Sequence, residues 1–498
     1  MLHISSLYQD LEQSLADLSL DKSNMLASRK VLESVLNDGH CYYGINTGFG
    51  FLANKKIDAD QLEQLQHNLL LSHSVGLGEM IPKNISRLML QLKIHALGLG
   101  YSGVSEAVFD RLLLFAHQDW IPVVPNKGSL GASGDLAPLA HLSLPLLGKG
   151  AFWDEAGEQS VESYKVLAKA GLSTIKLKAK DGLALINGTQ MMTAYGAFIL
   201  HRALSLVKNA DILACISLEA LKGSLQPFDQ RLHAIRAHPG QSDVAFNVRS
   251  LLQGSDISKS YQQDDKVQDP YSLRCIPQVH GATRDFLHYS SEVLERELNS
   301  VTDNPVIFAN GDVISGGNFH GQPLAFAMDA AAIALAELAN IAERRIYLLL
   351  KGLDGLPQVL VNDAGINSGF MIPQYTAASL VSHNKILCHP ASVDSIPSCL
   401  GQEDHVSMGS ISAIKLLEVL HNVEQVLAIE CFTAAQALDF RKPLKAGKGV
   451  DKAHQKIREK VSHKEADDLF RVDIECCTAM IRNNTLLDAV EAELGPLK

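Results

Sequence analysis

The sequence lacks the signatures of several common protein classes. Its eight cysteines include no C-x-x-C pair, which argues against a disulfide scaffold. It contains no H-E-x-x-H motif and no cysteine and histidine pair at zinc-finger spacing, so we expect no metal site. No uncharged apolar run reaches the roughly 18 residues of a membrane span, and residues 1–10 lack the basic and apolar regions of a signal peptide. We therefore expect a soluble cytoplasmic protein.

Positive charge is also scarce. The 498 residues carry 44 Lys and Arg against 55 Asp and Glu, for a formal net charge of -11. This balance argues against nucleic acid or an anionic membrane as a partner, because both attract clustered basic residues. The 46% hydrophobic content allows a large core and two or more domains. Small molecules and copies of the same chain are the expected partners.

The most unusual stretch present is residues 126–139, which reads Asn-Lys-Gly-Ser-Leu-Gly-Ala-Ser-Gly-Asp-Leu-Ala-Pro-Leu. Its glycines allow close backbone approaches that a Cβ atom would block. The amide nitrogen of Gly134 can approach the carbonyl carbon of Ala132 and close a five-membered ring. Dehydration, including loss of the Ser133 hydroxyl, would leave a methylidene group conjugated to an imidazolone. The product would be an electrophile, which no ordinary side chain supplies.

Simpler interpretations of the same stretch exist. A Gly- and Ser-rich loop before a helix is commonly a structural turn or an anion cradle. A nucleotide P-loop fits less well, because the Gly-Lys-Ser/Thr ending is absent. The stretch alone favours a structural turn, and the choice between a turn and a cyclised group depends on the other segments of the chain.

Apolar periodicity predicts a mainly helical protein. Leu65, Leu69 and His73 share one face of a helical segment, and residues 86–98 form another amphipathic helix. Residues 325–351 contain no Gly or Pro and would form a helix of about 40 Å, ended by Gly352. A second long apolar stripe consists of Leu416, Leu420, Val423, Leu427 and Cys431. Long helices with apolar faces favour a helix bundle that packs as a homo-oligomer.

Polar, irregular clusters separate these helices. Residues 181–190 are expected to form a tight, glycine-bracketed loop in which Asn187 is a turn former or presents an amide to a site. The other clusters lie at residues 267–275, 303–305 with 315–321, and 389–395 leading to 402–405. In the first of these, Arg274 offers a planar fork suited to a carboxylate. Taken singly, such residues are usually surface ion pairs or caps.

Together, these segments resemble the aromatic amino-acid ammonia-lyases that carry a 4-methylideneimidazole-5-one group. The most specific matches are residues 131–136, 268–275 and 402–408, and the resemblance extends from residue 43 to about residue 408. Independent matches in the same order replace the interpretation of a plain turn. The resemblance implies a mainly α fold, with a long-helix bundle of the aspartase/fumarase-like type over residues 198–498. It also implies a smaller, loop-rich N-terminal domain over residues 1–197 and a homotetramer whose sites are shared between subunits.

The resemblance also assigns roles to individual residues. Ala132, Ser133 and Gly134 would form the prosthetic group autocatalytically, without metal or nucleotide. Tyr43 would be the base that removes a β-proton, and Arg274 would hold the α-carboxylate. Asn187, Gln268 and Tyr271 would line the electrophile and the amino-acid head. Phe319 would pack against the substrate, and Glu403 would face the imidazole or the departing amine.

The implied chemistry explains these residue types. A β-proton of an amino acid is barely acidic, so elimination needs an oriented base, a fixed carboxylate and a better leaving group than free ammonia. Attack of the substrate amine on the methylidene group would supply that leaving group. A tyrosine ordinarily has a pKa of about 10. Tyr43 should therefore need a nearby cation or hydrogen-bond donor to stabilise its phenolate.

Substrate choice depends on few residues. Residues 71–73, Leu-Ser-His, resemble the histidine-selective pattern of the family, and His73 and Glu403 could both hydrogen-bond an imidazole. L-Histidine is therefore the expected substrate and trans-urocanate the expected product. The alternatives are a tyrosine or phenylalanine ammonia-lyase, a 2,3-aminomutase with the same group, or a helical scaffold whose loop never cyclises. His383 and Cys388 depart from the family pattern and leave the finer substrate range open.

Overall fold

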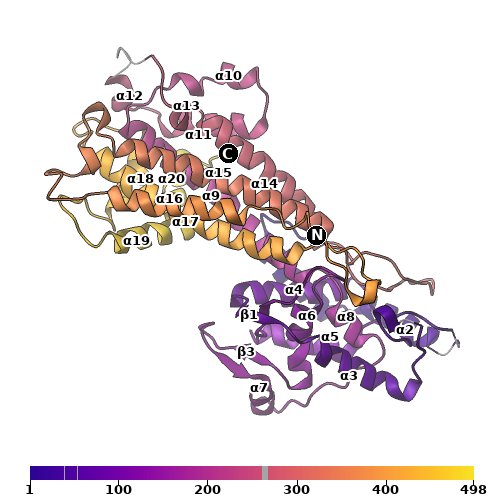
Figure 1. Ribbon diagram of the computed structural model, residues 1–498. Coiled ribbons are helices and arrows are strands. Elements are labelled where there is room, and N and C mark those ends of the chain that lie inside the picture. The colour runs from indigo at the N-terminus through magenta and orange to yellow at the C-terminus, as the bar shows by residue number, and fades with distance from the viewer. Residues whose placement is uncertain (37, 39, 53, 261–266) are drawn as a thin grey trace. The chain divides into compact units, whose positions relative to one another are not determined.

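The computed structural model describes residues 1–36, 38, 40–52, 54–260 and 267–498, which form two compact units (Figure 1). Unit 1 comprises residues 1–198, 291–329 and 390–414, and unit 2 comprises residues 199–290, 330–389 and 415–498. Helices dominate both units, whereas the described strands pair only as two-stranded antiparallel sheets. The predicted mainly α fold is therefore confirmed.

Unit 1 consists of short and medium helices with small strand pairs. Its helices are α1 (Leu7–Leu20), α2 (Ser23–Val35), α3 (Leu62–His73), α4 (Lys83–Gly98), α5 (Glu106–His117), α6 (Leu136–Ser143), α7 (Ser163–Lys169) and α8 (Asp181–Ile186). Its strand pairs are β1 (Leu77–Met80) with β2 (Pro125–Lys127), β3 (Ala151–Trp153) with β4 (Ser160–Glu162), and β5 (Val306–Ile307) with β6 (Val313–Ile314).

Three helices of unit 1 pack together and position the candidate site. The helices α3, α6 and α8 contact one another, and each has a predicted site residue at one end. His73 is the last residue of α3, Ser133 precedes the start of α6, and Asn187 is the C-cap of α8. The predicted helices over residues 65–73 and 86–98 are confirmed as α3 and α4.

Residues 181–190 differ from the expected loop. Residues 181–186 form the short helix α8, and α9 (Gln190–Ala220) begins a few residues later. A six-residue helix is too short for apolar periodicity to reveal, because it completes fewer than two turns. The loop is therefore confined to residues 187–189, between two helix ends.

Unit 2 contains long helices. The helices α9, α14 (Ile276–Leu298), α15 (Gln322–Leu349) and α17 (Gly409–Asp439) each contribute residues to both units. The remaining helices of unit 2 are α10 (Gln230–Ala234), α11 (Pro239–Leu251), α12 (Asp256–Ser260), α13 (Tyr271–Arg274), α16 (Met371–Leu387), α18 (Lys448–Arg458), α19 (Phe470–Arg482) and α20 (Thr485–Leu494).

The two longest helices predicted from the sequence are confirmed. The expected helix over residues 325–351 is α15, and Gly352 follows it with a φ of 71°, a left-handed conformation that suits glycine at a helix end. The stripe from Leu416 to Cys431 lies on α17, and its members are fully buried. Among the described residues, α15 alone is long and apolar enough to cross a membrane, and 72% of its most apolar window is buried, as in a core helix.

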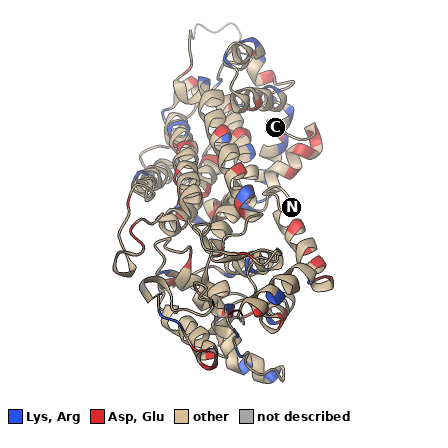
Figure 2. Cartoon of the chain, turned by 90° about the vertical axis from the view of Figure 1, so that its right-hand side faces the viewer, with Lys and Arg blue, Asp and Glu red and all other residues tan. Residues whose placement is uncertain are grey.

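Acidic residues outnumber basic residues in the chain by 55 to 44. Figure 2 shows acidic and basic residues interspersed along the helices. The division into domains at residues 197 and 198 stays a prediction, and the segments 291–329 and 390–414 of unit 1 lie beyond it in the chain.

Candidate active site

The Ala-Ser-Gly segment forms a strained turn. Gly131 and Gly134 pair across it as an isolated antiparallel bridge. Ser133 has a φ of 51°, a left-handed conformation that is uncommon for a serine. Gly134 has a φ of 78°, and a Cβ atom there would collide with the carbonyl group of Gly188. Only glycine fits at position 134, as the proposed cyclisation also requires.

Hydrogen bonds anchor this turn on both sides. Asp135 N donates to Gly188 O at 2.7 Å, and Gly188 N donates to Ser133 O at 3.3 Å. Met408 N donates to Leu130 O at 3.0 Å. These backbone bonds hold residues 130–135 between the α8–α9 connection and the start of α17.

Asp135 joins the turn to the N-terminus of α9. Its Oδ2 atom accepts hydrogen bonds from Met191 N and Met192 N, each at 3.0 Å. The side chain is fully buried, and burial raises the pKa of Asp135 to about 7, although the bonds from Met192 and Met191 oppose the rise. A helix N-terminus favours negative charge, so α9 directs a positive dipole end toward the turn.

A cavity of about 570 Å³ opens beside Ser133 in unit 1. It brings together several predicted site residues that are distant in sequence. They are Tyr43, His73, Ser133, Asn187, Phe319 and Glu403. Ala132 and Gly134 flank Ser133 in the turn, so the proposed electrophile would face this cavity. A larger cavity of about 900 Å³ lies in unit 2 among α16, α17 and α19, and its lining includes no predicted site residue among those described.

Tyr43 has one supporting hydrogen bond. Gly50 N donates to Tyr43 Oη at 3.2 Å, which stabilises a phenolate. Burial nevertheless raises the pKa of Tyr43, and the carboxylate of Glu403 raises it further, whereas the bond from Gly50 lowers it. The hydrogen bond expected to support a Tyr43 phenolate is therefore present, but within unit 1 burial changes the pKa of Tyr43 more than this bond does.

His73 presents a defined ring nitrogen to the cavity. Its Nδ1 atom lies 2.9 Å from Leu69 O, and a carbonyl oxygen only accepts, so Nδ1 carries the proton. Burial lowers the pKa of His73, against the hydrogen bond to Leu69 and the charge of Glu403. The ring is therefore held neutral with Nε2 as an acceptor.

Glu403 faces Ser133 across the cavity. Ser133 Oγ donates to Glu403 Oε1 at 3.4 Å, and Ser398 Oγ donates to Glu403 Oε2 at 2.6 Å. The bond to Ser398 fixes one carboxylate oxygen, which leaves the other directed at the serine of the turn. The cavity thus combines a hydrogen-bond acceptor at His73 with a carboxylate at Glu403.

The other predicted residues lie in unit 2. Gln268 and Tyr271 are exposed, and Arg274 stacks on Tyr271 with its Cζ atom 4.4 Å from the ring centroid. Arg274 Nε is buried and has no hydrogen-bond partner among the residues that the structure describes. The residues that line the cavity beside Ser133 belong to unit 1, and Gln268, Tyr271 and Arg274 are not among them.

Sequence reasoning missed two buried lysines, Lys93, which contacts Asn187, and Lys180, which contacts Asp303. Lys93 on α4 and Lys180 before α8 are 2% and 0% exposed, respectively. Lys93 shares the buried face of α4 with Met89, Leu90 and Leu97, so a lysine on an apolar stripe was the available signal. Lys180 carried no such signal, because it lies outside any periodic segment.

These features place a phenol, an imidazole and a carboxylate around a strained serine turn in a mainly helical chain. A sequence profile of the family described as "Aromatic amino acid lyase" matches residues 7–459. The chain therefore belongs to the aromatic amino acid lyase family, which confirms the family and the lyase class expected from the sequence.

Similar proteins cover nearly the whole chain. The histidine ammonia-lyase of Sorangium cellulosum (strain So ce56) is 51% identical over 482 residues, which cover 95% of this chain and 93% of the relative. The crystal structure of histidine ammonia-lyase from Trypanosoma cruzi matches with a TM-score of 0.88 and 39% identity, covering 95% of this chain and 89% of that one. Tyrosine aminomutase from Streptomyces globisporus matches with a TM-score of 0.90 and 36% identity, covering 98% and 94%.

Proposed function

We propose that this chain is a histidine ammonia-lyase, which converts L-histidine to trans-urocanate and ammonia. The reaction breaks the Cα–N bond and removes one β-proton, and it needs no oxidant or reductant. The observation that carries the proposal is the pairing of His73 and Glu403 in the cavity that Ser133 faces. Relatives with this printed activity, at about 50% identity over nearly the full chain, support it.

The imidazole ring of the substrate suits this pair. Neutral His73 offers Nε2 as an acceptor and Glu403 offers a carboxylate, so together they can accept both N–H groups of a protonated substrate imidazole. A phenyl ring would leave both groups without partners, which costs binding free energy in a buried site. This difference favours histidine over tyrosine or phenylalanine.

Tyr43 is proposed as the base that removes the β-proton, and Phe319 as an apolar contact for the substrate. Because burial and Glu403 raise the pKa of Tyr43, the phenolate requires a cation in the working enzyme. Arg274 would hold the α-carboxylate, and Gln268 and Tyr271 would line the electrophile and the amino-acid head. The Nε atom of Arg274 has no partner among the described residues, and its neighbours Gln268 and Tyr271 are exposed. Both observations support a homotetramer in which a site draws residues from more than one copy.

The prosthetic group fits the turn at residues 132–134. Gly134 tolerates no Cβ atom, Ser133 faces the cavity, and the N-terminus of α9 directs its dipole toward the segment through Asp135. A 4-methylideneimidazole-5-one formed from these residues would supply the electrophile for the amino group. Asn187 would orient that group and the amino-acid head. We further propose that the protein is cytoplasmic.

An alternative to histidine ammonia-lyase activity is supported by a similar structure. The tyrosine aminomutase at a TM-score of 0.90 favours a tyrosine ammonia-lyase or a 2,3-aminomutase as the second candidate. Incubation with L-histidine and detection of urocanate by its ultraviolet absorbance tests the first proposal, and coumarate or a β-amino acid from tyrosine without urocanate would refute it. An intact mass two waters below the sequence mass is expected, and an unmodified mass would refute cyclisation.

A further inference from the structure

Every polar group of Asn187 except one has a hydrogen-bond partner among the described residues. Its backbone N donates to Leu183 O at 3.0 Å, and its backbone O accepts from Lys93 Nζ at 2.6 Å. Its side-chain Nδ2 donates to Asp303 Oδ1 at 3.2 Å and to Asn304 O at 2.8 Å. Its Oδ1 atom is buried and has no partner among the described residues, although the residue lines the cavity beside Ser133.

These partners fix which way the amide points. A carboxylate oxygen and a backbone carbonyl oxygen can only accept hydrogen bonds, so the NH₂ group of Asn187 must face Asp303 and Asn304. The amide oxygen must then point away from them. A buried acceptor without a partner is costly, and a donor N–H of a bound ligand would satisfy it.

Asp303 is itself fixed at the opposite end of α8. Lys180, the N-cap of α8, places its Nζ 2.7 Å from Asp303 Oδ2, and the two side chains are 0% and 6% exposed. One carboxylate therefore contacts both ends of the helix, Lys180 at its start and Asn187 at its C-cap. The ion pair binds Oδ2, whereas Oδ1 accepts from Asn304 N at 2.7 Å and from the amide of Asn187 at 3.2 Å.

We propose that Asp303, held by Lys180, is a positioning residue that turns the amide oxygen of Asn187 toward the amino group of the substrate. The inference rests on the proposed function, because it assigns the ligand of that oxygen. It also gives a purpose to the Asp-Asn-Pro sequence at residues 303–305, since Asp303 and the carbonyl group of Asn304 together accept both bonds from the NH₂ group. An ammonium or amine N–H is the chemistry that the free oxygen accepts.

Replacing Asp303 by asparagine tests the charge while keeping the shape. In Asp303→Asn the new amide must direct its oxygen to the Lys180 ammonium, so its NH₂ group faces the NH₂ group of Asn187. The new NH₂ group then opposes two donors, the amide of Asn187 and the backbone N–H of Asn304, and the amide of Asn187 loses its fixed orientation. We expect kcat for L-histidine to fall by about tenfold or more, with a smaller change in KM, because a misplaced reacting group costs mainly the chemical step.

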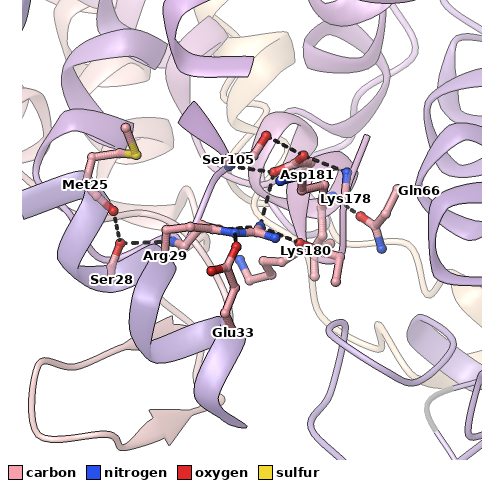
Figure 3. A network of polar contacts seen from close by, with 12 residues as sticks. Met25, Ser28, Arg29, Glu33, Gln66, Ser105, Lys178, Lys180 and Asp181 are labelled. Atoms are coloured by element: carbon pink, nitrogen blue, oxygen red, sulfur yellow. Dashed lines mark hydrogen bonds and ion pairs between the residues drawn. The ribbon is translucent and has the colours of Figure 1, made fainter. Parts of the chain in front are cut away.

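Asp181 supplies a matched control on the same helix. Figure 3 shows Asp181 among Ser105, Lys178 and Arg29. It accepts from Ser105 N and Ser105 Oγ at 2.7 Å each and from Lys178 N at 2.8 Å, and it is fully buried. Asp181→Asn therefore perturbs a buried carboxylate at the start of α8 without touching Asn187. We expect it to lower the thermal unfolding midpoint but to leave kcat within about twofold of the parent.

A double-mutant cycle shows whether Asp303 acts through Asn187. In an Asn187→Ala background, Asp303→Asn should change kcat by less than about twofold, because its target has gone. Asp181→Asn should have the same effect in both backgrounds. An equal fall in kcat for Asp303→Asn with and without Asn187 would overturn the proposal, as would equal kcat values for Asp303→Asn and Asp181→Asn.

Two further measurements keep the test decisive. If Asp303→Asn is insoluble, Asp303→Glu keeps the charge opposite Lys180 and displaces its oxygens by one methylene, and the same fall in kcat is expected. The parent enzyme is assayed in parallel for urocanate and for the mass deficit of two waters. A parent without urocanate refutes the proposed function, whereas a parent with full activity and an Asp303 variant of parental kcat refutes the positioning role alone.

Discussion

Lys93 provides a quantitative test of the environment behind the candidate site. Its side chain is 2% exposed on α4, and its Nζ donates to Asn187 O at 2.6 Å and to Gln190 Oε1 at 3.4 Å. Burial lowers the pKa of Lys93 from 10.5 to about 7. Among its charged neighbours, Asp303 and Asp135 oppose this shift and Lys180 adds to it.

The lowered pKa of Lys93 sets the sign of a pH effect on stability. Between pH 7 and 10.5 the unfolded chain carries a proton on Lys93 that the folded protein largely lacks. The stability contribution of Lys93 is therefore complete above its unfolded pKa and is lost as the pH falls toward its folded pKa. The slope is about 1.4 kcal/mol per pH unit, so the change from pH 8 to pH 10 amounts to about 3 kcal/mol.

The assay compares the parent protein with Lys93→Met by denaturant unfolding at pH 8, 9 and 10. At one fixed protein concentration, the contribution of oligomerisation affects both proteins alike. We expect the free energy of unfolding of the parent, minus that of the variant, to rise with pH by about 3 kcal/mol over this range. Lys30→Met, which changes an exposed lysine of α2, should run parallel to the parent. Parallel curves for Lys93→Met would refute a neutral, buried Lys93.

Four further substitutions test the cavity of unit 1. Ser133→Ala should reduce turnover of L-histidine by about 10³-fold or more and abolish the mass deficit of two waters, and full activity would exclude Ser133 as the precursor. Gly134→Ala should block cyclisation through its collision with the Gly188 carbonyl group, and an unmodified intact mass with retained helical circular dichroism would show this. Glu403→Gln removes a negative charge that raises the pKa of Tyr43, so the rising limb of the pH profile of kcat/KM should move to lower pH; an unmoved limb would contradict Tyr43 as the base. His73→Leu should raise KM for L-histidine by about tenfold or more, and an unchanged KM would separate His73 from the imidazole.

The helices could be predicted because their signal is local. The stripe on α17 recurs every three or four residues, and each member is buried, as amphipathic helices require. The short helix α8 carried no comparable pattern, and residues 181–190 were wrongly expected to form a loop throughout. The importance of the small residues at 131–134 could be predicted for a different reason, because the proposed cyclisation involves residues that are adjacent in the sequence.

The membership of the cavity could be predicted only in part, because Gln268, Tyr271 and Arg274 were expected in the same site and do not line it. Tyr43, His73, Ser133 and Glu403 were expected to share a site, and the structure places them around one cavity. Their electrostatics could not be predicted, since the pKa of Tyr43 depends on its burial and on the charge of Glu403. Both arise from packing between segments that are hundreds of positions apart.

The orientation of Asn187 shows most clearly what a sequence omits. Asparagine at position 187 suits a turn or a site equally, and its side chain can present either a donor or an acceptor. The choice is made by Asp303 and Asn304, which lie 116 and 117 positions away. Because both partners accept, the NH₂ group must face them and the amide oxygen must point away from them. The role of Asn187 therefore depends on two acceptors that are distant in the sequence, because they determine which atom of its amide is free for a ligand.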